Sequence, residues 1–92
     1  MRKVSYAKKF EKDFNKQKKN MSFKDLETFF YVVNKLKCSE TLEPKYRDHL
    51  LSGNYADFRE CHIKPDLLLI YTVDENYNEL ILTRLSSHSE LF

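Results

Sequence analysis

Glycine is nearly absent from this sequence of 92 residues, in which Gly53 is the only one. A glycine-rich loop that cradles phosphates is therefore excluded. Long apolar runs are absent too, since the longest, Leu67–Tyr71, is far shorter than a membrane span. No apolar segment follows the basic residues of the start, MRKVSYAKKF, so we expect no secretory signal.

Cysteine is also scarce, with Cys38 and Cys61 as the only two. Two cysteines are too few for a disulfide framework, and their surroundings show no metal-ligand spacing. We interpret them as unreactive buried thiols of a protein in the reducing cytoplasm, with a Cys38–Cys61 disulfide as the less favoured alternative. The sequence predicts neither a metal nor another cofactor.

Positive charge is concentrated at one end of the chain. Residues 1–20 contain eight Lys or Arg and two acidic residues, a net charge of +6; the whole chain carries +2, so the remainder carries −4. A basic face on an otherwise balanced protein suggests an anionic partner such as RNA, DNA or an acidic peptide. A solvated helix face is the simpler alternative. The candidate phosphate contacts are Lys8, Lys9, Lys12 and Lys16.

Apolar spacing predicts that the first half of the chain is helical. Val4–Tyr6 has the character of a short strand, and Tyr6, Phe10 and Phe14 follow at four-residue steps, as on one face of a helix. Ser22 and Asp25 have the spacing of a capping box at the start of a second helix. Two adjacent helices joined by a short polar turn form a hairpin with one apolar side. The apolar stripe expected on the second helix consists of Leu26, Phe29, Phe30, Val33 and Leu36.

The second half is predicted to form strands. Residues 38–54 show no regular pattern, whereas strands are expected at 56–63, 67–73 and 79–85, separated by tight turns. Successive strands with tight turns form an antiparallel meander, and the helical hairpin covers one face of it. The predicted fold is one two-layered α+β domain spanning residues 1–92, in the order β-α-α-β-β-β. The edge that the first strand joins does not follow from the pattern.

The meander brings polar residues together at one end of the sheet. In a meander, the end of the first strand, the start of the second and the end of the third all lie at the same end of the sheet. His62, Asp66, Arg84 and His88 occupy these positions, so we expect them to converge. Each of them alone is more simply a surface residue, and only the predicted convergence indicates a site. Strand order does not place His49, the third histidine of the chain.

Acid–base cleavage of RNA suits such a cluster best. One imidazole can deprotonate the ribose 2′-OH, another proton carrier can protonate the leaving 5′-oxygen, and Arg84 can neutralise the charge that grows on the phosphate. Phe92 is a candidate for stacking on a base, although it could instead pack into the core with Leu91. Glu60 and Lys64 flank the cluster and are secondary candidates. A zinc site or a Ser-His-Asp relay has no supporting spacing here.

The second half also carries a specific combination of motifs. The segment YRDHLLSGNYADFRECHIKPDLLLIY is followed by RLSSHSELF, and the first half contains FEKDF. In this order the motifs closely resemble the YafQ-type branch of the RelE/ParE toxin superfamily. The resemblance spans the full length, by motif in the second half and by pattern in the first.

This resemblance implies a bacterial toxin of a type II toxin–antitoxin pair with a RelE-like fold. Toxins of the YafQ type are metal-independent endoribonucleases that cut mRNA, typically in the ribosomal A site, and a small antitoxin encoded beside them silences them. The implied partners are mRNA on the ribosome and a cognate antitoxin. The family's functional residues fall on His49 of YRDH, His62 and Asp66 of HIKPD, Arg84 and His88 of RLSSH, and the terminal Phe92.

Two positions depart from the family pattern. Members often carry Trp after the Pro-Asp pair, where this chain has Leu67, and Gly before the last histidine, where it has Ser86. A residue other than glycine limits positive φ at that turn. We therefore expect His88 to approach the phosphate at a different angle, which affects the rate and preference of cleavage and not the type of reaction.

Two other functions stay open at this point. ParE-type toxins share the fold but bind DNA gyrase and cut no RNA, and they generally lack this set of histidines. A non-catalytic nucleic-acid-binding module would keep the basic first helix and Phe92 but would not need His88.

Overall fold

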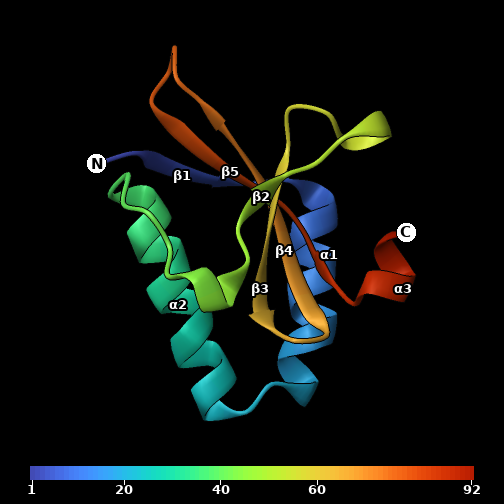
Figure 1. Ribbon diagram of the computed structural model, residues 1–92. Coiled ribbons are helices and arrows are strands. Elements are labelled where there is room, and N and C mark those ends of the chain that lie inside the picture. Colours follow the sequence, from blue (N-terminus) through green and yellow to red (C-terminus); the bar gives the residue numbers. More distant parts are fainter.

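The computed structural model describes all 92 residues, which form a five-stranded sheet, two long helices and several one-turn elements (Figure 1). Along the chain the elements are β1 (Lys3–Tyr6), α1 (Lys8–Gln17), η1 (Lys18–Asn20), α2 (Phe23–Lys37), η2 (Pro44–Tyr46), β2 (His49–Leu50), η3 (Gly53–Tyr55), β3 (Arg59–Lys64), β4 (Leu67–Asp74), β5 (Glu79–Ser86) and α3 (His88–Leu91). None of the helices is both long and apolar enough to cross a membrane.

The strands lie in the order β1-β5-β4-β3-β2. β3, β4 and β5 form the predicted antiparallel meander. β1 joins the outer edge of β5 in parallel, with Val4 opposite Leu80 and Tyr6 opposite Leu82, so the first strand of the chain pairs with the last. The α+β fold class predicted from the sequence is confirmed, with a parallel pairing at one edge of the sheet.

Several predicted boundaries shift by a few residues. Tyr6 is the last residue of β1 and does not belong to the helix, which begins at Lys8. β3 begins at Arg59 and not at residue 56, because Asp57 has a left-handed φ of 77° that an extended strand does not adopt. Residues 38–54, expected to be irregular, contain η2 and β2, which are too short to produce a periodic signal.

The helical hairpin forms as predicted, with one correction to its apolar stripe (Figure 1). At the start of α2 the Asp25 N–H donates to Ser22 Oγ and the Ser22 N–H donates to Asp25 Oδ2, which completes the capping box. Phe29 and Leu36 are buried, but Val32 occupies the core while Phe30 is exposed. The stripe therefore follows one angular face of the helix, and Phe30 lies about 100° away from its neighbour Phe29.

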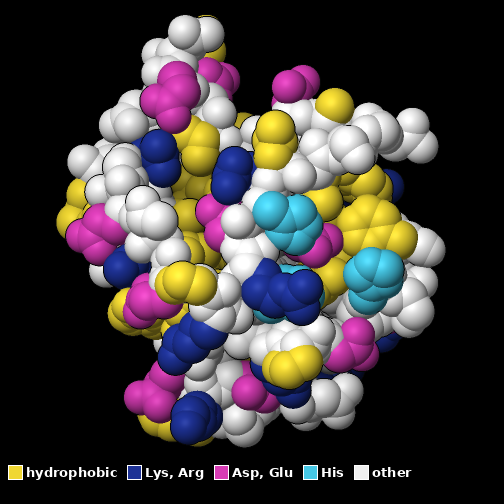
Figure 2. Space-filling view, in the orientation of Figure 1, with side chains coloured by type: hydrophobic (Ala, Val, Ile, Leu, Met, Phe, Trp, Pro, Cys, Tyr) yellow, Lys and Arg dark blue, Asp and Glu magenta, His cyan; other side chains and the backbone are white.

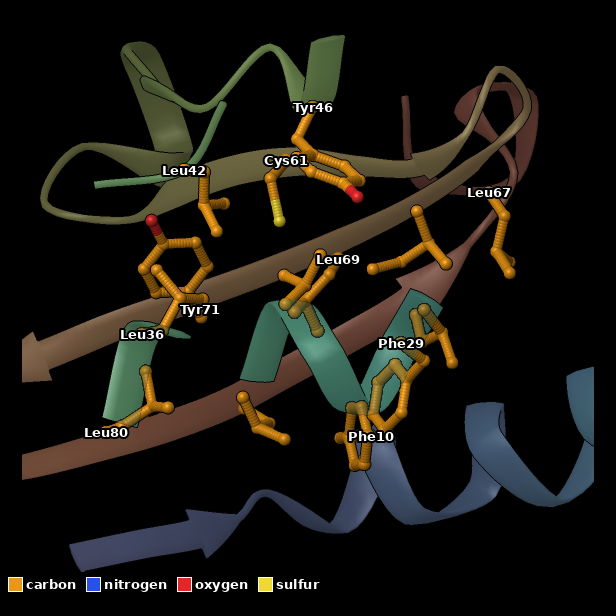
Figure 3. Close-up of a cluster of buried hydrophobic side chains, with 14 residues drawn as sticks. Phe10, Phe29, Leu36, Leu42, Tyr46, Cys61, Leu67, Leu69, Tyr71 and Leu80 are labelled. Atoms are coloured by element: carbon orange, nitrogen blue, oxygen red, sulfur yellow. The ribbon is translucent and has the colours of Figure 1, made fainter. Parts of the chain in front are cut away.

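Apolar side chains cover both faces of the central strand β4. On the helix side, residues such as Phe10, Phe29, Leu69 and Tyr71 pack in the larger cluster (Figure 3). On the opposite side a smaller cluster of Leu68, Ile70 and Leu91 is flanked by Leu51, Tyr55 and Phe58. A strand that is buried on both faces has a nearly continuous apolar sequence, as β4 has. The smaller cluster holds α3 and the 51–58 loop against the sheet.

Both cysteines are free thiols, as predicted. Cys61 is fully buried in the larger cluster, and this burial raises the pKa of its thiol far above the usual range. Cys38 is only half-buried, at the end of α2, so the expectation of two buried thiols is correct for Cys61 alone.

Candidate functional site

The predicted residues His49, His62 and Arg84 lie on the face of the sheet that the helical hairpin leaves uncovered. His49, Glu60, Ile70 and Arg84 face one another across β2, β3, β4 and β5, because directly opposite residues project to the same side. The next row pairs His62 with Leu68 and Leu68 with Ser86. Figure 2 shows the three histidine side chains gathered on this face, with Lys or Arg side chains between them.

Glu60 lies between two of the histidines. Its Oε1 is 3.6 Å from His49 Nε2 and 3.7 Å from His62 Nε2. The Glu60 side chain is only 5% exposed, and its Oε2 is buried without a hydrogen-bond partner. A buried carboxylate with an unsatisfied oxygen is costly, and its negative charge lies directly beside both imidazole rings.

The backbone before His49 fixes its ring. His49 Nδ1 donates to the Arg47 carbonyl oxygen at 2.7 Å, because a carbonyl can only accept. In the neutral imidazole this leaves the Nε2 lone pair free on the side of Glu60. The side chain of Asp48 points the other way, where it accepts from Arg59 Nη2 at 3.2 Å and from the hydroxyl of Tyr71. Asp48 therefore anchors the two-residue strand that carries His49.

Arg84 is held from the first helix. Its Nε donates to Asp13 Oδ2 at 2.7 Å and its Nη2 to Asp13 Oδ1 at 3.3 Å, and the same carboxylate accepts the Leu85 N–H at 3.0 Å. β5 extends beyond the end of β1 and has no neighbouring strand on that side there. The Asp13 carboxylate accepts the Leu85 N–H in place of such a strand. The hydrogen bonds to Asp13 raise the pKa of Arg84, and the Tyr55 hydroxyl contributes further. Two of the five N–H groups are engaged, which leaves both N–H groups of Nη1 and one of Nη2 for a ligand.

The one-turn helix α3, which the sequence did not predict, positions His88 and Phe92. A capping box forms between Ser87 and Glu90, and Leu91 is buried in the smaller cluster. The His88 N–H donates to Asp66 Oδ1 at 3.4 Å, which brings the start of β4 next to the last histidine as predicted. Asp66 therefore contacts the backbone of His88 and not its ring.

Phe92 stays on the surface, with 54% of it exposed. Its ring lies 5.0 Å from the His88 ring and 5.5 Å from the Tyr55 ring, edge-on in the second case. The alternative in which Leu91 and Phe92 both pack into the core holds for Leu91 alone. The half-buried Tyr55 and the exposed Phe92 form an aromatic surface next to His88.

Glu90 connects α3 to the rest of the molecule. It accepts from Lys16 Nζ at 2.7 Å, from Ser86 Oγ at 2.7 Å and from Ser87 Oγ at 2.9 Å. These bonds, the one from Lys16 foremost, lower the pKa of Glu90 to about 2. The Lys16 ammonium therefore holds α3, whereas Lys8, Lys9 and Lys12 are exposed on α1 and form no ion pair.

The two departures from the family pattern have structural counterparts. Leu67 is buried in the larger cluster on the helix side, away from the histidines. Ser86 is the last residue of β5 and does not adopt a positive φ, so no strain arises there. Its buried hydroxyl instead donates to Glu90, a bond that glycine could not make. Among the secondary candidates, Lys64 is engaged by Asp25 at 3.0 Å.

Comparison with known proteins identifies the family. The family model for YafQ, a bacterial toxin of type II toxin–antitoxin systems, matches residues 2–92. This chain belongs to the YafQ toxin family.

Individual YafQ relatives cover nearly the whole chain. A protein from Haemophilus influenzae described as a putative toxin YafQ is 34% identical over 95 residues, which cover 96% of this chain and 89% of the relative. The mRNA interferase toxin YafQ of Escherichia coli K12 is 29% identical over 92 residues, covering 99% of this chain and 96% of that protein.

Solved structures show the same fold. A metal-bound toxin from Helicobacter pylori is 49% identical with a TM-score of 0.91, and the match covers all of both chains. The Escherichia coli DinJ-YafQ complex contains a chain that is 28% identical with a TM-score of 0.85, covering 100% of this chain and 99% of that one. In our structure no three or more His, Cys, Asp or Glu side chains are grouped in a way that could hold a metal ion.

Sequence reasoning missed the residues of this YafQ family member that support the site. Asp13 and Asp48 hold Arg84 and the backbone beside His49, and Tyr55 completes the aromatic surface. Asp48 lies within the YRDH motif, which was a usable signal. Asp13 is one of two acidic residues in a basic helix, and no pattern in the sequence links it to a strand 71 residues later.

Proposed function

We propose that this protein is an mRNA endoribonuclease, the toxin of a type II toxin–antitoxin system, and that it cleaves through the ribose 2′-OH. The observation that carries the proposal is the single sheet face on which His49, His62 and Arg84 lie beside the α3 residue His88. This face offers proton carriers and a fixed cation around one point. The Escherichia coli relatives are mRNA interferase toxins, which supports the same activity.

The reaction begins with removal of the 2′-OH proton. His49 is suited to this step because its Nδ1 donates to the Arg47 carbonyl and its Nε2 lone pair is free. The 2′-oxygen attacks phosphorus, and the bond from phosphorus to the 5′-oxygen breaks. A 2′,3′-cyclic phosphate forms on one fragment. The proton taken from ribose leaves His49 positively charged, and the Glu60 carboxylate stabilises this charge from 3.6 Å.

Two further groups complete the reaction. Arg84, oriented by Asp13, donates its remaining N–H groups to the phosphate oxygens as negative charge develops. His88 supplies the proton to the leaving 5′-oxygen, with Asp66 fixing the backbone of this histidine. His62 shares Glu60 with His49 and assists as a second acid–base group. The mechanism needs no metal because ribose itself provides the nucleophile.

The aromatic surface of Tyr55 and Phe92 holds the RNA next to the reacting phosphate. An unstacked base that packs on an aromatic ring gains about 1–3 kcal/mol. Because an aromatic face accepts any base, this contact positions the strand and supplies little sequence preference. DNA lacks the 2′-OH and would not be cut even if it were bound.

The proposed partners follow from the family. We infer that the protein acts on mRNA at the ribosome in the bacterial cytoplasm, and that a cognate antitoxin binds and inhibits it. The Escherichia coli relative likewise forms a complex, with DinJ. An acidic, partly disordered antitoxin segment would be attracted by the exposed lysines of α1.

The test is RNA cleavage by the wild type and by His88→Ala, with the fold of both checked by circular dichroism. Loss of a proton carrier should lower the cleavage rate by about 10²–10⁴-fold while RNA binding persists. Ser89→Ala, an exposed neighbour on α3, is the matched control. Equal cleavage by both variants would remove His88 from the mechanism. Growth arrest without any RNA cuts would favour the gyrase-inhibiting function of ParE-type toxins.

A further inference from the structure

A basic hollow lies beside His62, on the side away from Arg84. We propose that this hollow binds backbone phosphates of the RNA strand adjacent to the cleaved bond. The proposal rests on the proposed function, since it assigns a substrate site next to the same catalytic residues. The hollow has a volume of about 400 Å³ and is lined by Lys24, Asp25, Thr28, Lys45, Tyr46, Arg47, His62, Ile63, Lys64 and Pro65.

The charges in the basic hollow are unbalanced. Asp25 is its only carboxylate, and this group is engaged by Lys64 at 3.0 Å and by the Ser22 N–H. The other three cations, Lys24, Lys45 and Arg47, are exposed and form no ion pair. Three uncompensated positive charges around one hollow attract a polyanion, and each cation that meets a phosphate releases a bound counterion.

The backbone holds Arg47 at a fixed place on the rim. Arg47 has a left-handed φ of 52° at the end of η2, and its carbonyl accepts the His49 Nδ1–H. The next residue, Asp48, is anchored by Arg59 and Tyr71. Arg47 is thus held by the same contacts that orient His49. Its planar guanidinium fits two phosphate oxygens at once, which a lysine cannot do.

Arg84 alone cannot serve two neighbouring phosphates. Two of its N–H groups are engaged by Asp13, and its side chain is only 22% exposed. A strand whose reacting phosphate lies between Arg84 and the histidines has to continue past His62, and His62 lines the basic hollow. The hollow therefore receives the next part of the strand.

The two ends of the site differ in chemistry. The end near His88 carries the exposed ring of Phe92 beside the half-buried ring of Tyr55, which suit a base. The basic hollow has few apolar side chains and several cations, which suit phosphate and not bases. An acidic peptide could meet the same charges, but the position of the hollow directly beside His62 favours the RNA substrate.

The experiment uses a short single-stranded RNA with 2′-O-methyl sugars, which cannot be cleaved. Its binding to the full chain is measured by fluorescence anisotropy at several salt concentrations. The variant Lys24→Gln/Lys45→Gln/Arg47→Gln removes the three free charges, all at exposed positions. The control Lys18→Gln/Lys19→Gln/Lys37→Gln lowers the net charge equally, outside the basic hollow.

We expect the hollow variant to lose at least tenfold in affinity, and the slope of log K against log salt to become shallower by about 2. The control should lose less than threefold. Equal losses in both variants, or an unchanged slope, would overturn the proposal. Loss of antitoxin binding with RNA binding intact would also overturn it and assign the hollow to an acidic peptide.

This measurement separates the inference from the proposed function. A protein that binds RNA through the hollow but cuts none would refute the endoribonuclease function and leave the binding site in place. A protein that cuts RNA at the wild-type rate and affinity without the three cations would refute the binding site alone.

Discussion

Asp13, in the middle of α1, holds the guanidinium of Arg84 on β5 through hydrogen bonds of 2.7 and 3.3 Å. The two residues are 71 positions apart in the chain, and this contact joins the basic helix to the site. The negative charge of Asp13 orients the cation without occupying the N–H groups that a phosphate would use. The same carboxylate also terminates the open edge of β5.

Replacing Asp13 should therefore weaken both the fold and the reaction. Asp13→Ala leaves the Leu85 N–H and two Arg84 donors without partners, which we expect to lower the free energy of unfolding by about 1–3 kcal/mol. Urea unfolding measures this loss, and cleavage by folded protein measures the effect on Arg84. Glu11→Ala, an exposed neighbour on α1, should change neither quantity. Unaltered cleavage by Asp13→Ala would show that Arg84 needs no orientation.

Glu60→Gln should raise the stability of the fold while it lowers the cleavage rate. The Glu60 carboxylate is buried with an unpartnered Oε2, so removal of its charge should stabilise the fold by about 1 kcal/mol. The cleavage rate should fall by at least tenfold, because the carboxylate no longer stabilises the charge that forms on His49. Urea midpoints and single-turnover rates give the two values. Glu27→Gln, exposed on α2, is the control, and a rate equal to wild type would exclude an electrostatic role for Glu60.

The stability of α3 in its place against the sheet should depend on pH, because the Glu90 carboxylate holds it there. Its pKa in the folded protein is about 2, below the ordinary value of 4.5, because Lys16, Ser86 and Ser87 donate to the carboxylate. The stabilisation is therefore present above about pH 4.5 and is lost as the pH falls through 2. NMR signals of Leu91 and Phe92 should follow this titration. In Lys16→Gln the midpoint should rise toward the ordinary value, and a wild-type midpoint near 4.5 would contradict the contacts described.

Tyr71→Phe should destabilise the protein by removing a buried hydrogen bond to Asp48. The Tyr71 hydroxyl is buried and donates to Asp48, and burial together with this carboxylate raises the pKa of Tyr71. Loss of a buried hydrogen bond to a charged group should lower the free energy of unfolding by about 1.5–3 kcal/mol. Thermal unfolding provides the measurement. Tyr77→Phe, at an exposed position in the β4–β5 turn, should leave the midpoint unchanged.

Short sequence patterns predicted the elements that depend on contacts between residues close together in the chain. The capping box at Ser22, the turn at Pro65 and the apolar run of β4 each reflect a few neighbouring residues. The meander then placed His62, Asp66, Arg84 and His88 at one end of the sheet, because tight turns leave no other arrangement of three successive strands. The family motif placed His49, and the structure accounts for its position through the pairing of His49 with Glu60.

Contacts between distant residues could not be predicted in this way. Two ion pairs connect the first helix with the last part of the chain: Asp13 with Arg84, and Lys16 with Glu90. No periodicity in the sequence relates the two members of either pair. The choice of Val32 over Phe30 for the core depends on the angle at which α2 meets the sheet, and a stripe of adjacent apolar residues does not specify that angle. α3 is a single turn stabilised by Leu91 in the smaller cluster, so tertiary packing and not propensity forms it.

The pairing of β1 with β5 has a consequence for the time at which this molecule becomes harmful. During translation the first strand and helix emerge early, but β5, Arg84 and Glu90, which they contact, are made more than 60 residues later. An incomplete chain has neither an oriented Arg84 nor an anchored α3. The toxin therefore acquires its complete site only after β5 and α3 have been synthesised and have reached the first helix.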